Sequence, residues 1–195
     1  MIDASGSGAP RVCGHEIERM RQLLIAFLLF GFMVWSRAGL LEAQTAPLTA
    51  SARASCEALL QTRNLTITYA GIASTRDGIT YCYVKGILAP AIQFHVQLPL
   101  LGQWNGRFIK WGDGGKDGDL DFADHRVGEG YAVANSNTGH DSGAEPGSSF
   151  AYQNRQAEID FGYRAVHLTT VAGKTLARRY YERPPDYAYF EGCST

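Results

Sequence analysis

Apolar and polar residues alternate along several short segments in the first half of the chain. The clearest segment is 92–98, where four apolar residues fall on one face of an extended strand and Pro99 follows. Residues 65–69 alternate in the same way, and residues 81–88 form a further candidate. These three segments predict strands that pair antiparallel at the start of a sheet.

Farther along the chain, short apolar strands alternate with segments of helical spacing. The predicted order is a strand over 107–111, a helix over 120–127, a strand over 131–135, a long helix over 155–183 and a strand over 187–190. Pro184 and Pro185 end the long helix. Strands that alternate with helices, and that open into Gly-rich loops, predict an α/β fold with a mostly parallel sheet.

The longest apolar run, residues 23–35, lies near the N-terminus behind Arg19 and Arg21. Its 13 residues are fewer than the roughly 20 that span a bilayer. They suit the apolar region of a secretory signal peptide, because small residues follow up to Ala43 or Ala46. A membrane anchor or a buried helix is the alternative.

This interpretation divides the chain into three parts. Residues 1–19 form a mis-assigned upstream leader, residues 20–46 the signal peptide with cleavage near 43–46, and residues 47–195 the mature domain. The mature domain is then expected to be secreted or periplasmic, without stable membrane association after cleavage.

Composition and charge exclude several classes of function. The net charge is −1, charged residues make up 19 %, and no basic run interleaves with aromatic residues, so we expect no nucleic-acid partner. Asp117, Asp119 and Asp121 resemble the start of a calcium loop, but no Glu closes it at the required offset. No Cys/His cluster has zinc-ligand spacing, so we expect no metal or cofactor in this segment.

The cysteines carry information about folding. Cys13 precedes the signal, which leaves Cys56, Cys82 and Cys193 in the mature domain, an odd number. Cys56 and Cys82 could close a loop at the start of this domain, and Cys193 would then lack a partner. A truncated chain explains that orphan most simply.

The candidate nucleophile is Ser194, within Gly192-Cys193-Ser194 and directly after a predicted strand. Gly-x-Ser at the end of a strand is the first half of a nucleophile elbow, the turn that exposes a catalytic serine. The full pattern would place another Gly after Thr195. The alternative is an ordinary serine in a surface turn.

A second candidate feature is the Gly-rich run over 112–115, which follows a predicted strand. Acyl transfer needs backbone N–H donors for the developing oxyanion. In α/β-hydrolases one donor follows the nucleophile, here Thr195, and the other comes from a Gly-rich loop, here Gly114 or Gly115. An ordinary glycine turn is the alternative.

The histidines offer no clear catalytic base. His140 lies in a loop at a strand end, where a structural role is still the stronger interpretation, while His95 falls on the polar face of a strand and His167 in the long helix. The hydrolase order places the triad acid and histidine after the nucleophile, and nothing but Thr195 follows Ser194.

Many short motifs then occur in one order along residues 56–195. They include Cys82-Tyr83-Val84-Lys85-Gly86, Trp104-Asn105-Gly106-Arg107-Phe108, Gly130-Tyr131-Ala132-Val133, Asn137-Thr138-Gly139-His140, the run over 161–167 and the run over 189–195. This series resembles the tannase and feruloyl esterase family. The sequence departs from the family pattern at two places. It has Asn137 where the family usually has Asp, and it has Asp113 where the family usually has a plainer run of glycines.

The resemblance implies a secreted serine esterase with an α/β-hydrolase fold. Ser194 would be the nucleophile, and Cys193 would pair with a cysteine beside the triad histidine. The triad Asp and His, that cysteine and a calcium-bearing lid would all follow residue 195. We therefore expect a truncated α/β-hydrolase-like sheet with antiparallel N-terminal strands, which ends at the nucleophile elbow.

The resemblance also implies a substrate class. The expected substrates are small-molecule or plant-polymer phenolic esters, feruloyl or galloyl, and the truncated chain is expected to be inactive. The alternative from another class of protein is a non-enzymatic secreted module that binds phenolics or glycans.

Overall fold

The computed structural model describes residues 50–112, 114–116 and 118–193. The leader and signal peptide expected over 1–46 lie outside the described residues, as do Ser194 and Thr195. In the part that is described, no helix combines the length and the apolar character needed to cross a membrane.

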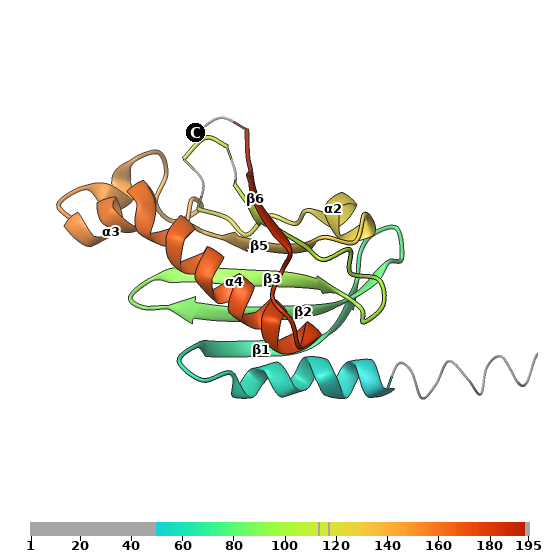
Figure 1. The fold of residues 1–195 in the computed structure, drawn as a ribbon. Helices are drawn as coiled ribbons and strands as arrows, with labels where there is room; N and C mark the ends of the chain where they lie inside the picture. The colour runs from blue at the N-terminus through green and yellow to red at the C-terminus, as the bar shows by residue number, and fades with distance from the viewer. Residues whose placement is uncertain (1–49, 113, 117, 194–195) are drawn as a thin grey trace, which may run out of the picture. The chain divides into compact units, whose positions relative to one another are not determined.

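The described residues include a six-stranded sheet with the strand order β1-β2-β3-β5-β4-β6 (Figure 1). The strands are β1 (Thr66–Ser74), β2 (Thr80–Leu88), β3 (Ile92–Pro99), β4 (Arg107–Trp111), β5 (Ala132–Ser136) and β6 (Tyr187–Glu191). Each strand that the hydrophobic pattern predicts is present, with ends that differ by a few residues.

The strand directions change midway through the sheet. β1, β2, β3 and β5 pair antiparallel, whereas β4 pairs parallel with both β5 and β6. The antiparallel N-terminal strands are therefore confirmed, but the prediction of a mostly parallel sheet is wrong for the described strands. The reason is connection length, since the three residues between β2 and β3 allow only a hairpin, and parallel pairs need a longer crossover.

The helices connect and cover the strands. The helical segments are residues 50–57, η1 (Ala58–Gln61), α2 (Asp124–Gly128), η2 (Ser149–Ala151), α3 (Arg155–Ile159), η3 (Asp160–Arg164) and α4 (Ala165–Tyr181). The long helix predicted over 155–183 is thus present as α3, η3 and α4 in succession. Asn154 caps its start by accepting a hydrogen bond from the backbone of Ala157, and Glu182 ends it in the left-handed conformation.

The helix predicted over 120–127 is wrong in its first half. α2 begins only at Asp124, and residues 120–123 have no regular structure. Their backbone donors are taken by side chains of the sheet, because Asn135 accepts from the Asp121 N–H and Gln97 from the Ala123 N–H, both at 3.1 Å. His95 also bonds to the Asp121 carbonyl at 2.8 Å, and a helix over these residues would need that carbonyl as an acceptor for its own backbone.

The sheet is covered on both faces (Figure 1). α4 packs on one face, where its buried residues meet Phe94, Val96 and Leu98 of β3 in the larger core. On the other face, Ala123 and Val127 pack with Tyr81 and Val133 in a smaller core. This second face carries the loop between β4 and α2, and with it the candidate site.

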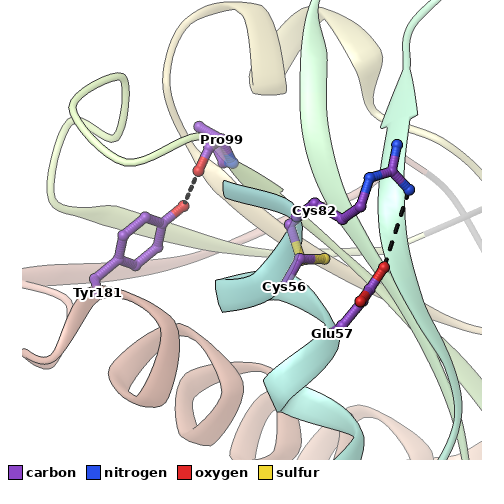
Figure 2. Close-up of a disulfide and its surroundings, with 6 residues drawn as sticks. Cys56, Glu57, Cys82, Pro99 and Tyr181 are labelled. Atoms are coloured by element: carbon purple, nitrogen blue, oxygen red, sulfur yellow. Dashed lines mark hydrogen bonds and ion pairs between the residues drawn. A yellow bond between two sulfur atoms is a disulfide. The ribbon is translucent and has the colours of Figure 1, made fainter. Parts of the chain in front are cut away.

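A disulfide joins Cys56 to Cys82, 26 residues apart (Figure 2). It ties the helix over 50–57 to β2, and both cysteines are fully buried within the larger core. Cys193 is a free, exposed thiol. Close to the disulfide, the Tyr181 hydroxyl at the end of α4 donates to the Pro99 carbonyl at 2.8 Å (Figure 2). The pairing expected from the sequence is present.

Replacing both Cys56 and Cys82 with alanine should lower the free energy of unfolding by about 3 kcal/mol, because the crosslink closes a loop of this length in the unfolded chain. Guanidinium unfolding monitored by circular dichroism measures the change. Cys193→Ala is the matched control, since it removes an exposed thiol and should stay within about 0.5 kcal/mol. Peptide mapping that finds Cys193 in the main disulfide would contradict the pairing.

Candidate active site

A cavity of about 210 Å³ lies at the carboxyl ends of the neighbouring parallel strands β4 and β6. Its lining residues are Trp111, Gly112, Gly114, Asp121, Glu191, Gly192 and Cys193. Ligands of α/β proteins bind at the carboxyl ends of strands, so the location is favourable. The cavity brings together two features that the sequence singles out, the glycine run after β4 and the Gly-Cys pair before Ser194.

Two glycines allow the strand ends to approach this closely. The Gly112 N–H donates to the Glu191 carbonyl at 2.6 Å. A Cβ added at Gly112 would lie 2.7 Å from the Phe190 ring and 3.3 Å from the Gly192 Cα, and a Cβ at Gly192 would lie 3.2 Å from the Gly112 Cα. A side chain at Gly112 would displace the Phe190 ring and crowd the main chain of Gly192, and a side chain at Gly192 would crowd the main chain of Gly112.

The predicted site residues are only partly placed by the structure. Gly114 and Cys193 line the cavity, and Gly115, with φ of 63°, is exposed beside it in the same loop. Ser194 and Thr195 lie outside the described residues. Their roles as nucleophile and oxyanion donor therefore stay predictions.

An ion pair holds the end of β6. Arg126 of α2 donates from Nε and a terminal nitrogen to both carboxylate oxygens of Glu191, at 2.9 and 2.6 Å, and from its other terminal nitrogen to Glu129 at 2.7 Å. The hydrogen bond from Arg126 lowers the pKa of Glu191. Such bidentate pairs fix orientation as well as position. Sequence analysis missed this pair, since its partners are 65 residues apart and belong to no local motif.

The polar face of β3 is buried, and its side chains hold the chain that returns from the glycine run. His95, Gln97 and the neighbouring Asn135 of β5 are all fully buried. His95 bonds to the Asp121 carbonyl at 2.8 Å, Asn135 to the Asp121 N–H, and Gln97 to both Ala123 and Asp124. The alternation along β3 indicated this face, but nothing in the sequence indicated what covers it.

His95 is a structural histidine rather than a catalytic base. A carbonyl can only accept, so Nε2 carries the proton shared with Asp121, and Nδ1 accepts from the Tyr83 hydroxyl at 3.2 Å. Burial lowers the pKa of His95 to about 4, which leaves the ring neutral near pH 7.

The other histidines that the sequence singles out are not among the residues that line the cavity. His140 is buried and stacks on Phe150 with ring centroids 3.8 Å apart, and His167 is exposed on α4. Among the described residues that line the cavity there is no histidine.

The burial of neutral His95 predicts a loss of stability in acid. Its pKa is about 4 in the folded chain and 6.5 when unfolded, so the unfolded state binds the proton first as the pH falls. The contribution of neutral His95 to the free energy of unfolding is fully present above pH 6.5. About 3 kcal/mol of it is lost as the pH falls from 6.5 to 4. The charged groups that act on the ring, Lys110, Lys85 and Asp124, are included in this shift.

Urea unfolding across this pH range measures the effect. His95→Gln keeps an N–H donor but has no group that titrates. Between pH 6.5 and 4, its free energy of unfolding should fall by about 3 kcal/mol less than that of the wild type. His167→Gln, at an exposed position, is the matched control and should follow the wild type. Parallel curves for the wild type and His95→Gln would refute the neutral, buried state.

Comparison with solved structures supports the α/β-hydrolase-like fold that the sequence predicts. The crystal structure of an esterase from Aspergillus oryzae aligns with a TM-score of 0.64 and 22 % identity, covering 73 % of this chain and 32 % of that one. Feruloyl esterase B from Aspergillus oryzae aligns with a TM-score of 0.60 and 25 % identity, covering 72 % and 32 %.

Curated relatives match the same region. A probable feruloyl esterase B-2 of Aspergillus flavus is 38 % identical over 114 residues, which is 57 % of this chain and 21 % of the relative. Feruloyl esterase B of Aspergillus niger is 32 % identical over 130 residues, 63 % of this chain and 24 % of the relative. The matched part thus spans about a quarter or less of the length of these relatives.

The family model for tannase and feruloyl esterase matches residues 76–195, more than half of the chain. This match includes every strand from β2 onward and all residues that line the cavity. The chain belongs to the tannase and feruloyl esterase family.

Proposed function

We propose that this protein is a carboxylic-ester hydrolase for phenolic-acid esters, with Ser194 as its nucleophile. One observation carries the proposal: the glycine run after β4 and the Gly192-Cys193 pair line a single cavity at the carboxyl ends of parallel strands. The family match and the names of the feruloyl esterase relatives support the reaction class.

The proposed chemistry follows from this arrangement. The Ser194 hydroxyl attacks the ester carbonyl carbon while a histidine base accepts its proton, and the oxyanion that forms receives backbone N–H groups of Thr195 and of Gly114 or Gly115. Collapse of the tetrahedral intermediate releases the alcohol and leaves an acyl-serine, which water then hydrolyses. The base and its orienting carboxylate come from residues that follow Ser194, as in other α/β-hydrolases.

We also propose that the protein is exported. The apolar run over 23–35 has the length and flanks of a signal peptide. The disulfide between Cys56 and Cys82 supports export independently, because such crosslinks persist in oxidising compartments. Edman sequencing of the protein recovered outside the cytoplasm should give an N-terminus near residue 47.

The test uses the whole product of the reading frame that encodes these residues, which we call the frame product. It should hydrolyse methyl ferulate or methyl gallate much faster than methyl cyclohexanecarboxylate, which has an ester but no phenol. The DNA beyond codon 195 should encode Gly-Gly, a later Asp and a His-Cys pair. A stop codon at that point together with phenolic binding but no hydrolysis would instead support a non-enzymatic binding module.

A further inference from the structure

The side chain of Asn135 joins the two ends of the loop over residues 112–120, which we call the glycine loop. Its Nδ2 donates to the carbonyl of Trp111 at 3.3 Å, and its Oδ1 accepts from the N–H of Asp121 at 3.1 Å. Only this orientation of the amide fits, since a carbonyl needs a donor and an N–H needs an acceptor. One side chain therefore closes the glycine loop at its base.

This contact is buried and reinforced from the neighbouring strand. Asn135 is fully buried and lies directly opposite His95 in the register of β3 and β5. His95 holds the carbonyl of Asp121 while Asn135 holds its N–H. Asp121, the residue directly after the glycine loop, is thus bonded to the sheet through both of its backbone polar groups.

The glycine loop is rich in glycine, and the carbonyl of Gly118 within it accepts from the Ser142 N–H at 3.4 Å. It contains Gly112, Gly114, Gly115 and Gly118, and the last two have φ of 63° and 103°. Glycine-rich backbone samples many conformations, so the course of such a loop depends on how its ends are held. Both ends that Asn135 bonds, Trp111 and Asp121, line the candidate cavity together with Gly114.

We propose that Asn135 is a positioning residue, which holds the glycine loop so that its backbone N–H groups face the reacting ester. This inference rests on the proposed function. Asparagine suits the role because it offers one donor and one acceptor on a planar group. Aspartate of equal size keeps the acceptor but has no N–H for Trp111, and leucine has neither.

The first measurement is hydrogen exchange by mass spectrometry on the frame product. In Asn135→Asp and Asn135→Leu, exchange of amides in residues 112–121 should accelerate about tenfold, as expected for loss of a buried hydrogen bond. Exchange in β2 and β3 should stay unchanged. Asn105→Asp is the matched control, because Asn105 also joins two backbone segments, at Glu129 and Arg107, away from the cavity. Its glycine loop should exchange as in the wild type.

The second measurement separates positioning from general stability. Asn135→Asp should lower kcat for methyl ferulate between about tenfold and a hundredfold with little change in KM, below the loss of 10²–10³ for a missing oxyanion donor. Asn105→Asp should leave kcat unchanged. Unchanged exchange in both Asn135 variants, or faster exchange with an unchanged kcat, would overturn the inference. A wild-type frame product without esterase activity would contradict the proposed function. The hydrogen-exchange rates alone would then decide whether Asn135 holds the glycine loop.

Discussion

Replacing Ser194 with alanine in the frame product should lower kcat for methyl ferulate about a millionfold, the cost seen when a triad serine is removed. The reason is that the proposed acyl intermediate forms on the Ser194 hydroxyl, so without it only the proposed oxyanion donors and substrate binding remain. Progress curves under saturating substrate measure the loss. Ser148→Ala is the matched control, since Ser148 is exposed and far along the chain from the cavity lining, and its kcat should not change.

The same reasoning predicts that a polypeptide limited to residues 47–195 is inert. No histidine is among the described residues that line the cavity, and His95 is neutral with both ring nitrogens bonded. A serine hydroxyl without a neighbouring base is a weak nucleophile. Ser194→Ala should therefore make no difference in this shorter polypeptide. Turnover by it at about 1–1000 per second would overturn the assignment of a base beyond residue 195.

The second large effect concerns β6. Among the described strands β6 pairs only with β4, and most of its residues are exposed. Tyr187, Tyr189 and Phe190 have exposed fractions of 62, 47 and 62 %. An open edge flanked by apolar side chains is a template for intermolecular pairing. We expect a polypeptide of residues 47–195 to aggregate at micromolar concentration.

Light scattering and sedimentation of the refolded polypeptide measure this tendency. The double change Tyr187→Lys and Tyr189→Lys places charges on the open edge and should keep most of the polypeptide soluble and monomeric. Tyr152→Lys is the matched control, because Tyr152 is 78 % exposed but lies outside the sheet, and aggregation should persist. A soluble wild-type monomer with one sharp thermal transition would contradict the prediction.

The sequence was informative where local pattern decides structure. The strand over 107–111 is predicted to the residue, because a short apolar run before a glycine run has few alternatives. The disulfide could be expected because three cysteines remain in the mature domain and the first two could close a loop at its start. The two parallel pairings that build the cavity also follow from strands separated by helices.

The failures come from side-chain hydrogen bonds that leave no pattern of apolar spacing, some between residues far apart in the sequence and some between residues one helical turn apart. Residues 120–123 were predicted as helix, yet side chains from Gln97 and Asn135 take their backbone donors. The long helix has continuous apolar spacing, and its π-helical turn η3 coincides with buried Asp160, which accepts from Arg164 and Gln156. Neither contact leaves a periodic signal in the sequence.

The meeting of Gly112 with Gly192 has a consequence for how this family member can diversify. The two strand ends meet backbone to backbone at these glycines, and a Cβ at Gly192 would press on the main chain of Gly112, which no rotamer change can relieve. A methyl group gained at either glycine would disturb the contact between the end of β4 and the end of β6. Directed evolution toward bulkier esters should therefore leave these two codons untouched and accumulate its beneficial changes at positions whose side chains can still repack.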